Sequence, residues 1–279
     1  MKLSIFVPSR SLSPLSLVGR LGGSVLVVSV VFPLCVLVSS SSWGGLIEAL
    51  NDPRFLQALA LSLRTTFVSV ALVTILGTPL AWWLASTPGR LSGAVSVLLE
   101  LPIMIPPAVI GVALLMTFGR TGVLGAWLST KGIFIAFTPM AVVLSQVTVS
   151  APYFVQAAAN AFREVTPDTI VVARSLGATS STAFLRVALP IALPGVIVGA
   201  SLAWARALGE FGATLLFAGN LPGHTQTMPL AIFYALESDV RMAVVLATLL
   251  VAFGAVLLLS LRLIPSLAAS VGPRNRDFR

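Results

Sequence analysis

The chain is short of charge. Only 9% of its 279 residues are Asp, Glu, Lys or Arg, whereas 57% are hydrophobic and the mean hydropathy is +1.02. Soluble domains carry roughly 25% charged residues. The deficit excludes an ordinary soluble domain and predicts an all-α, polytopic membrane protein.

Lysine is nearly absent, although arginine brings the net charge to +8. The two lysines, Lys2 and Lys131, do not follow a glycine, whereas a P-loop requires G-x-x-x-x-G-K-[ST]. ATP hydrolysis of that type is therefore excluded. The chain also lacks a basic run interleaved with aromatic residues, which argues against nucleic acid as a partner.

Cysteine occurs once, as Cys35 inside an apolar run. A single cysteine excludes an internal disulfide, a cysteine-based metal site and a redox pair. His224 stands alone in a loop with no cluster of ligand residues. The sequence therefore predicts no metal site.

Uncharged stretches predict six transmembrane helices, each long enough to cross about 30 Å of hydrocarbon. They lie near residues 21–41, 62–86, 97–118, 133–156, 188–217 and 242–263. The first stretch follows Lys2, Arg10 and Arg20 and can be read as a cleavable signal peptide. Its length and the missing A-x-A-like site favour a retained helix.

Arginine and lysine in the connections indicate the orientation. With the N-terminus inside, the outer connections hold only Arg54, Arg64, Arg120, Lys131 and Arg241, and the inner side holds most of the rest. Both termini are therefore expected in the cytoplasm.

The longest polar inner connection, about residues 160–186, separates the fourth and fifth spans. Thr166-Pro167-Asp168 is typical of a helix start, and Gly177 of a helix stop. Thr179 offers a new cap. The segment predicts two short helices at the membrane surface, suited to docking a soluble partner.

Arg206 and Glu210 interrupt the fifth span. A lone charge at the bilayer centre costs about 2.5–3.5 kcal/mol, and the spacing of four residues allows the two to pair on one helix face. They are either a structural or gating pair, or Arg206 contacts a translocated anion. Thr214 can supply a neutral hydroxyl to the same path.

Proline and glycine mark two further features. Pro102, Pro106 and Pro107 interrupt the third span, and predict either a kink at a gate or a fixed bend used for packing. Gly195 and Gly199 form a G-x-x-x-G step that favours close helix packing.

The stretch VVARSLGATSSTAFLRVALP, residues 171–190, resembles the cytoplasmic signature of ABC-importer permeases, Glu-Ala-Ala, three residues, Gly, nine residues, Ile-x-Leu-Pro. Ala173, Gly177, Leu189 and Pro190 match in register, and Val187 stands for the Ile. Val171 and Val172 replace the Glu and the first Ala. The resemblance implies that Ala173, Arg174, Gly177, Ala178, Leu189 and Pro190 couple the chain to an ATPase.

Three other stretches resemble the molybdate permease branch, with sulfate and thiosulfate permeases as close relatives. They are LPIMIPPAVIG (101–111), WARALGEFGATLLFAGN (204–220) and TQTMPLAIF (225–233). The resemblance spans residues 55–264 of what is expected to be one transmembrane domain, residues 1–279.

The resemblance implies a permease homodimer in the lipid of a bacterial or archaeal cytoplasmic (inner) membrane, two ATPase subunits and an external binding protein. The binding protein delivers an oxyanion, for which molybdate is the favoured assignment. This chain is then a transport subunit without an enzyme activity or cofactor of its own, and ATP and Mg²⁺ are used by the ATPase. Pro106, Pro107, Arg206, Glu210 and Thr214 are the candidates for the path or gate. The alternatives are sulfate, thiosulfate or tungstate as cargo, a proton-coupled transporter with Glu210 as carrier, and a non-transporting scaffold.

Overall fold

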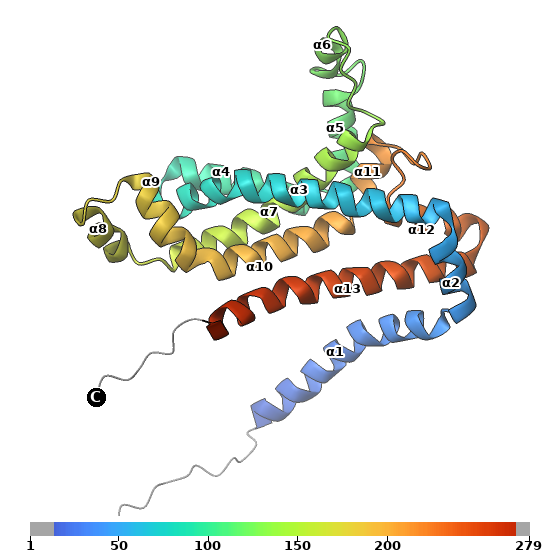
Figure 1. The fold of residues 1–279 in the computed structure, drawn as a ribbon, viewed down its shortest axis with the longest axis horizontal. Coiled ribbons are helices and arrows are strands. Elements are labelled where there is room, and N and C mark those ends of the chain that lie inside the picture. The colour runs from blue at the N-terminus through green and yellow to red at the C-terminus, as the bar shows by residue number, and fades with distance from the viewer. Residues whose placement is uncertain (1–13, 272–279) are drawn as a thin grey trace, which may run out of the picture.

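A computed structural model describes residues 14–271, with side chains from 18 to 260 (Figure 1). Both chain ends, whose cytoplasmic location the sequence predicts, lie outside these residues. The elements are α1 (Pro14–Ser40), α2 (Trp43–Asn51), α3 (Pro53–Ser86), α4 (Arg90–Met104), α5 (Pro107–Phe118), α6 (Gly125–Ser129), α7 (Pro139–Arg163), α8 (Pro167–Ser175), α9 (Ser180–Ala183), the π-helical turn η1 (Phe184–Ala188), α10 (Leu189–Leu208), α11 (Gly212–Phe217), α12 (Met228–Ser238) and α13 (Val240–Val271).

The described residues are helical with no strand, which confirms the predicted fold class. Five of these helices are long and apolar enough to cross a membrane, or six when the bent pair α4–α5 counts as one span. Their hydropathy follows from the six uncharged stretches in the sequence, so the predicted number of spans is confirmed.

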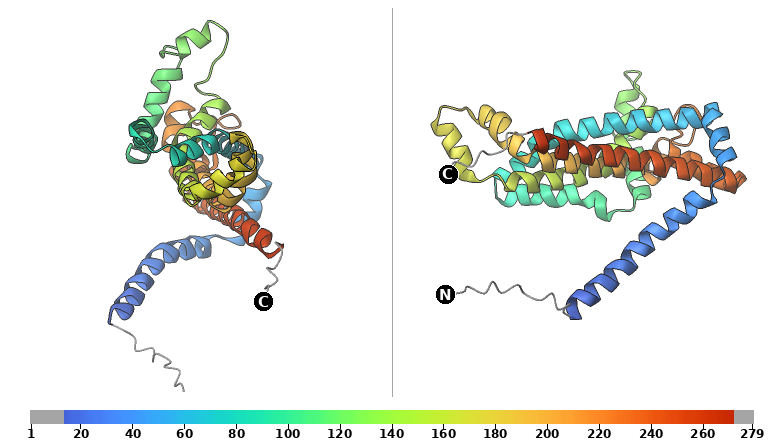
Figure 2. Two further views of the ribbon diagram at one scale, coloured as in Figure 1. Left: turned by 90° about the vertical axis from the view of Figure 1, so that its left-hand side faces the viewer. Right: turned by 60° about the horizontal axis from the view of Figure 1, so that its bottom comes forward.

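The centre of the molecule is a bundle in which α7 packs against both α3 and α10, with α13 beside α10 (Figures 1 and 2). Small residues allow α7 and α10 to approach closely. A Cβ atom on Gly199 would lie 3.1 Å from the Phe154 carbonyl oxygen, and one on Gly195 would meet the Cβ atom of Ala161. The packing expected from the G-x-x-x-G step is therefore confirmed.

A buried amide joins α3 to α7. The Gln146 Nε2 atom donates to the Thr66 hydroxyl at 3.2 Å, and the Ser69 hydroxyl donates to Gln146 Oε1 at 3.0 Å. All three side chains are at most 1% exposed. Because an unpaired amide is costly in an apolar interior, this network fixes the register of the two helices.

Three predicted spans differ from the structure. The third is broken between α4 and α5, where the helix direction bends by 112°. As a result, α5 and α6 form an arm that projects from the bundle (Figure 1). The fifth ends as a helix at Leu208 and resumes as α11 at Gly212. The fourth starts at Pro139 rather than 133 and continues to Arg163, because hydropathy does not distinguish an apolar loop from an apolar helix.

The first helix, α1, diverges from the bundle and contacts it mainly through α13 (Figure 2). None of its membrane-length stretch, Val18–Ser40, is buried within the chain. An apolar helix in this position is stable in lipid, where its backbone hydrogen bonds are internal.

The contact between α5 and α11 depends on Gly111. A Cβ atom there would lie 2.8 Å from the Ala213 carbonyl oxygen and 2.9 Å from its Cα atom. We expect Gly111→Ala to force the two helices apart and destabilise the protein by about 1–3 kcal/mol. Gly93→Ala in α4 is the matched control, because no heavy atom lies within 4 Å of its added Cβ, and it should be neutral or stabilising. Thermal unfolding of the detergent-solubilised variants measures both, and equal melting temperatures would contradict the close contact.

Candidate functional site

The two broken spans meet. Gly212, the first residue of α11, lies against the first turn of α5, and a Cβ atom on it would be 3.1 Å from the Ala108 nitrogen and 3.2 Å from the Pro107 Cβ. Non-helical backbone at membrane depth is tolerated only where protein or water satisfies it. The two breaks contact each other through Gly212, whereas Pro106 and Gly209 remain exposed in the single chain.

Proline is the local cause of the first break. Pro106 and Pro107 have no N–H group, and Pro106 adopts φ −54° and ψ 134°, outside the helical region. Proline also disfavours the helical conformation in the residue before it, and Ile105 is accordingly extended (φ −81°, ψ 131°). Pro102 lies inside α4 without breaking it. The predicted interruption therefore falls at residues 105–106.

Glu210 occupies the second break. The sequence placed it on the same helix face as Arg206, but α10 ends at Leu208 and Glu210 lies beyond the helix. The pairing is nevertheless confirmed, because Arg206 Nη1 donates to Glu210 Oε2 at 2.7 Å. The Ala213 N–H donates to Glu210 Oε1 at 2.7 Å and so holds the first turn of α11.

Glu210 and Arg206 differ in how far their side chains are exposed. Glu210 is 1% exposed and both of its oxygens accept a hydrogen bond. The Arg206 side chain is 24% exposed and, within the part of the chain that is described, only its Nη1 atom has a side-chain partner. A guanidinium has five N–H donors. Arg206 is therefore the member of the pair that can also reach an anion.

Thr214, the third candidate on this path, lies in α11 and is fully buried. Its hydroxyl has no hydrogen-bond partner among the residues described. The conformation seen here therefore keeps this hydroxyl from any ion, and movement of α11 is needed to expose it.

The predicted coupling segment projects from one end of the bundle, at the end opposite α2 and α12 (Figure 1). Helix α8 begins at Pro167 and ends before Gly177, whose φ is +91°. The Gly177 N–H donates to the Arg174 carbonyl at 3.0 Å, and the Ala178 N–H donates to the Ala173 carbonyl at 3.1 Å. This pair of bonds is the Schellman motif, which requires a left-handed residue at the glycine position.

The second helix is not separate as predicted, because α9, η1 and α10 run on without a gap as one helix, Ser180–Leu208. The Thr179 hydroxyl accepts from the Thr182 N–H at 3.2 Å and caps α9. The predicted helix start, glycine stop and new cap are all confirmed. Leu189 and Pro190 form the first turn of α10, so the six coupling candidates lie on one continuous path from α8 into the bundle.

Three aromatic rings attach this segment to the bundle. Phe184, in the turn η1, lies 5.6 Å from the Trp82 ring of α3 and 5.9 Å from the Phe162 ring of α7, centroid to centroid. The segment exposes apolar side chains among its polar ones, including Leu176 (83% exposed) and Val171 (60%). Sequence analysis did not identify this cluster, although an aromatic residue beside the coupling motif was available as a signal.

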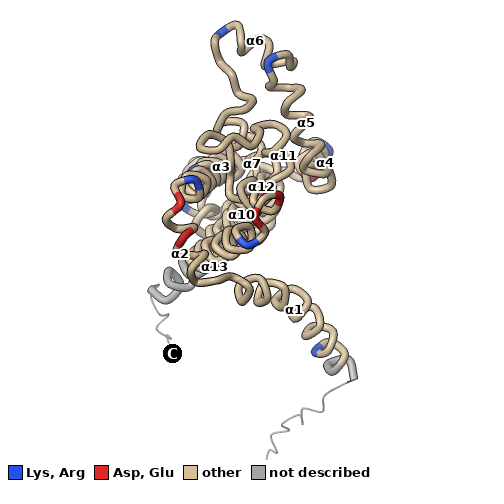
Figure 3. The backbone as a smooth tube through the Cα atoms, turned by 90° about the vertical axis from the view of Figure 1, so that its right-hand side faces the viewer, with Lys and Arg blue, Asp and Glu red and all other residues tan. Residues whose placement is uncertain are grey.

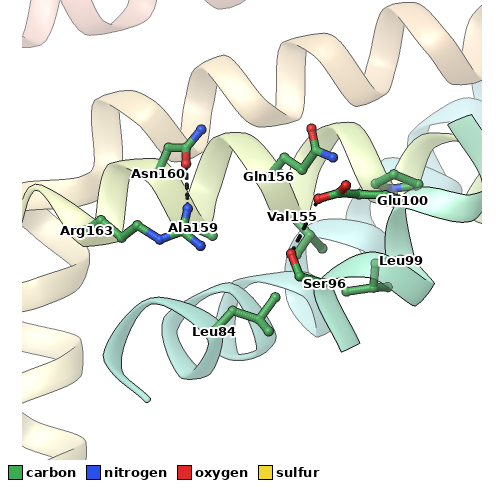
Figure 4. Close-up of a pocket in the computed structure, with 10 residues that line it drawn as sticks. Leu84, Ser96, Leu99, Glu100, Val155, Gln156, Ala159, Asn160 and Arg163 are labelled. Carbon is green, nitrogen blue, oxygen red and sulfur yellow. Dashed lines mark hydrogen bonds between the residues drawn. The ribbon is translucent and has the colours of Figure 1, made fainter. Parts of the chain in front are cut away.

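A polar pocket of about 370 Å³ lies between α4 and α7, above the start of the segment (Figure 4). Arg163 Nη1 donates to Asn160 Oδ1 at 2.6 Å, and the Ser96 hydroxyl donates to Glu100 at 3.4 Å. Gln156 faces the same space (Figure 4). These side chains come from the ends of two predicted spans and from the polar connection after the second of them, and the sequence does not show that they meet.

Solved structures share the fold. A bacterial ABC transporter involved in the import of the acidic polysaccharide alginate aligns over 92% of this chain and 98% of its own, with a TM-score of 0.68 and 17% identity. The chain thus has the fold of that transporter chain.

The sequence identifies the family. Residues 77–269 match the binding-protein-dependent transport system inner membrane component family. The molybdenum transport system permease protein ModB of Mycobacterium tuberculosis is 44% identical over 84% of this chain and 88% of its own length. The sulfate transport system permease protein CysT of Escherichia coli is 32% identical over 88% and 91%. The chain belongs to this family of multi-pass inner-membrane permeases.

The ion pair yields a test of its two possible roles. We expect Arg206→Ala to destabilise the protein by about 3–5 kcal/mol, because it leaves the buried carboxylate of Glu210 without its cation. Adding Glu210→Gln should restore stability, since an amide oxygen can still accept from the Ala213 N–H. Thermal unfolding and uptake are measured on both variants, with Arg241→Ala at an exposed arginine as the control.

The combined readouts separate the roles. Recovery of stability and uptake in the double variant means that the pair is structural, and recovery of stability alone means that Arg206 serves the anion. An Arg206→Ala variant as stable as the parent protein would contradict the pairing.

Proposed function

We propose that this chain is the permease subunit of an ABC importer that moves a tetrahedral oxyanion, with molybdate as the cargo. The observation that carries the proposal is the coupling segment, in which the Gly177 turn presents α8 and α9 outside the membrane while Phe184 holds them to the bundle. The identity of 44% to molybdenum permeases supports the cargo.

ATPase subunits and a binding protein complete the proposed transporter. Because the sequence holds no P-loop, ATP and Mg²⁺ are used by two ATPase subunits that dock on the two coupling segments of a permease dimer. A binding protein on the opposite side delivers the anion; one of the structural relatives is a transporter in complex with its ligand-bound periplasmic protein. The coupling segments and both chain ends then face the cytoplasm, in agreement with the arginine distribution.

A second copy of this chain fits the exposed arm. Helices α5 and α6 leave the bundle at a steep angle and present apolar side chains, among them Met116 (70% exposed) and Trp127 (62%). A partner permease that covers this arm forms the path between two copies of the α5–α11 contact. In that position Pro106 and Pro107 act as the gate hinge, and Arg206 supplies positive potential to a dianion.

The transport cycle follows from the connections. Closure of the ATPases brings the two coupling segments together, and the Phe184 cluster transmits that movement to α3 and α7 while Pro190 transmits it to α10. The α5–α11 contact then opens and exposes the hydroxyl of Thr214. Few charges line this route, which suits a permease that releases its cargo rather than retaining it.

Sulfate, thiosulfate or tungstate is the second candidate cargo, favoured by the 32% identity to a sulfate permease. These tetrahedral dianions present similar charge and shape to the path. A proton-coupled carrier is disfavoured, because both oxygens of Glu210 already accept hydrogen bonds.

Reconstitution tests the proposal. The permease is placed in proteoliposomes with the ATPase and binding protein encoded beside it, and uptake of labelled molybdate is measured with sulfate as competitor. We expect uptake only with ATP and both partners, and little inhibition by sulfate. Uptake against a gradient by the permease alone would contradict the assignment as an ABC-importer subunit. Preferential uptake of sulfate would assign sulfate rather than molybdate as the cargo.

The glycine turn yields a second test. We expect Gly177→Asp to lower ATP-dependent uptake at least about tenfold, because a non-glycine residue at φ +91° costs about 1–3 kcal/mol and distorts the turn. Gly132→Asp is the matched control, since Gly132 also has a positive φ (+74°) and open space around it but lies on the arm. Co-purification of the ATPase should fall only for Gly177→Asp, and equal losses in both variants would assign the effect to strain alone.

A further inference from the structure

A second pocket, of about 460 Å³, lies at the end of the bundle away from the coupling segment. It is formed where α3 and α13 begin, beside α12 and the loop before it. Figure 3 looks onto this end and shows acidic and basic positions close together there. The lining residues that carry the inference are Asp52, Arg54, Phe55, Gln226, Asp239 and Leu246.

Two carboxylates at this pocket each have one oxygen atom without a hydrogen bond to the described chain. Asp52 Oδ1 accepts from the Arg54 N–H at 2.8 Å and caps α3, and Asp239 Oδ1 accepts from the Arg241 N–H at 2.9 Å and caps α13. In the described chain, neither Oδ2 atom receives a hydrogen bond or an ion pair. Each carboxylate therefore fixes a helix start with one oxygen and presents the other to a ligand.

Gln226 supplies an independent observation. Its side chain is 8% exposed and lines the pocket, yet its amide makes no hydrogen bond to any residue that the structure describes. Neither amide atom is among the fully enclosed unpaired atoms of the described chain, so the amide opens onto the pocket. It can therefore accept from or donate to a polar ligand there.

The pocket extends from the membrane surface into the hydrocarbon. Leu246 lies six residues into α13, about 9 Å below its start at a rise of 1.5 Å per residue, and Phe55 lies in the first turn of α3. Exposed Trp43 and Tyr234 lie at the same end, as aromatic residues do at headgroup level. The polar groups are thus near the surface and the apolar ones deeper, which matches an amphiphile.

We propose that this pocket binds a phospholipid with a primary ammonium headgroup, such as phosphatidylethanolamine. The ammonium donates to the free oxygens of Asp52 and Asp239 and to the Gln226 amide oxygen, Arg54 pairs with the phosphate, and an acyl chain runs along Phe55 and Leu246. Two carboxylates and one guanidinium complement an ammonium beside a phosphate. A choline headgroup has no N–H donor, and a glycerol headgroup has no cation. The proposal depends on the membrane location of the bundle and not on the cargo.

Lipid binding to the purified full-length permease in nanodiscs tests the proposal. Retention of dioleoyl phosphatidylethanolamine, phosphatidylcholine and phosphatidylglycerol is compared by native mass spectrometry. We expect the ethanolamine lipid to be retained at least about tenfold better than the other two, the ratio that one charge-assisted hydrogen bond supplies. Equal retention of all three lipids by the unmodified protein would overturn the proposal.

A charge-matched pair of variants locates the site. Asp52→Asn combined with Asp239→Asn should abolish the preference without unfolding, because asparagine also caps helices. Glu48→Gln combined with Glu237→Gln removes the same charge from exposed positions outside the pocket and should leave the preference intact. An unchanged preference in the asparagine variant would refute the site.

The alternative occupant of the pocket is a lysine or arginine side chain of an external protein. If the asparagine variant keeps its lipid preference but no longer binds the external binding protein, the pocket is a protein contact and the lipid proposal is wrong. Molybdate uptake by the unmodified complex is measured separately, so failure of the lipid site does not affect the proposed function.

Discussion

The need to satisfy backbone hydrogen bonds in hydrocarbon governs this structure. Two spans are broken at membrane depth, at residues 105–106 and 209–211, and neither break is stable facing lipid. The two segments contact each other through Gly111 and Gly212, which have no side chain to separate them, whereas Pro106 and Gly209 remain exposed in the single chain. Glu210 completes the arrangement, because its carboxylate accepts both from Arg206 and from the start of α11. The charges within the fifth span are thus explained first by the break that they hold together.

The α3–α7 pair and the α5–α11 contact differ in how many hydrogen bonds join their helices. Helices α3 and α7 are joined by the hydrogen bonds of Gln146 to Thr66 and Ser69 and by the Trp82–Phe162 contact. At the α5–α11 contact, the Thr214 hydroxyl has no described partner and the closest approach is backbone to glycine. We therefore expect a force applied through Phe184 to move α3 and α7 together, and the α5–α11 contact, which has fewer polar bonds between its helices, to open first.

Sequence reasoning succeeded where one physical rule dominates. Hydropathy located the six spans, and glycine, proline and threonine located the limits of α8 and the start of α9, because local backbone preferences decide them. It found the Arg206–Glu210 pair from helical spacing, although Glu210 proved to lie beyond the helix. The bend of 112°, the separate helix α11 and the pocket between α4 and α7 were not predictable. Each depends on which segments meet in space, and periodicity in a uniformly apolar span does not specify a partner.

The position of Gln146 shows how such contacts can be recognised from the sequence. An amide within an apolar span needs a partner at its own depth, and Thr66 and Ser69 are the hydroxyls that α3 offers there. Gln226 differs, because it has no side-chain partner in the described chain and its amide opens onto a pocket rather than onto another helix. A paired amide at full burial fixes two helices, whereas an unpaired amide that faces a pocket beside two carboxylates is available to a ligand. Enclosure thus distinguishes the amide used for packing from the amide that we assign to binding.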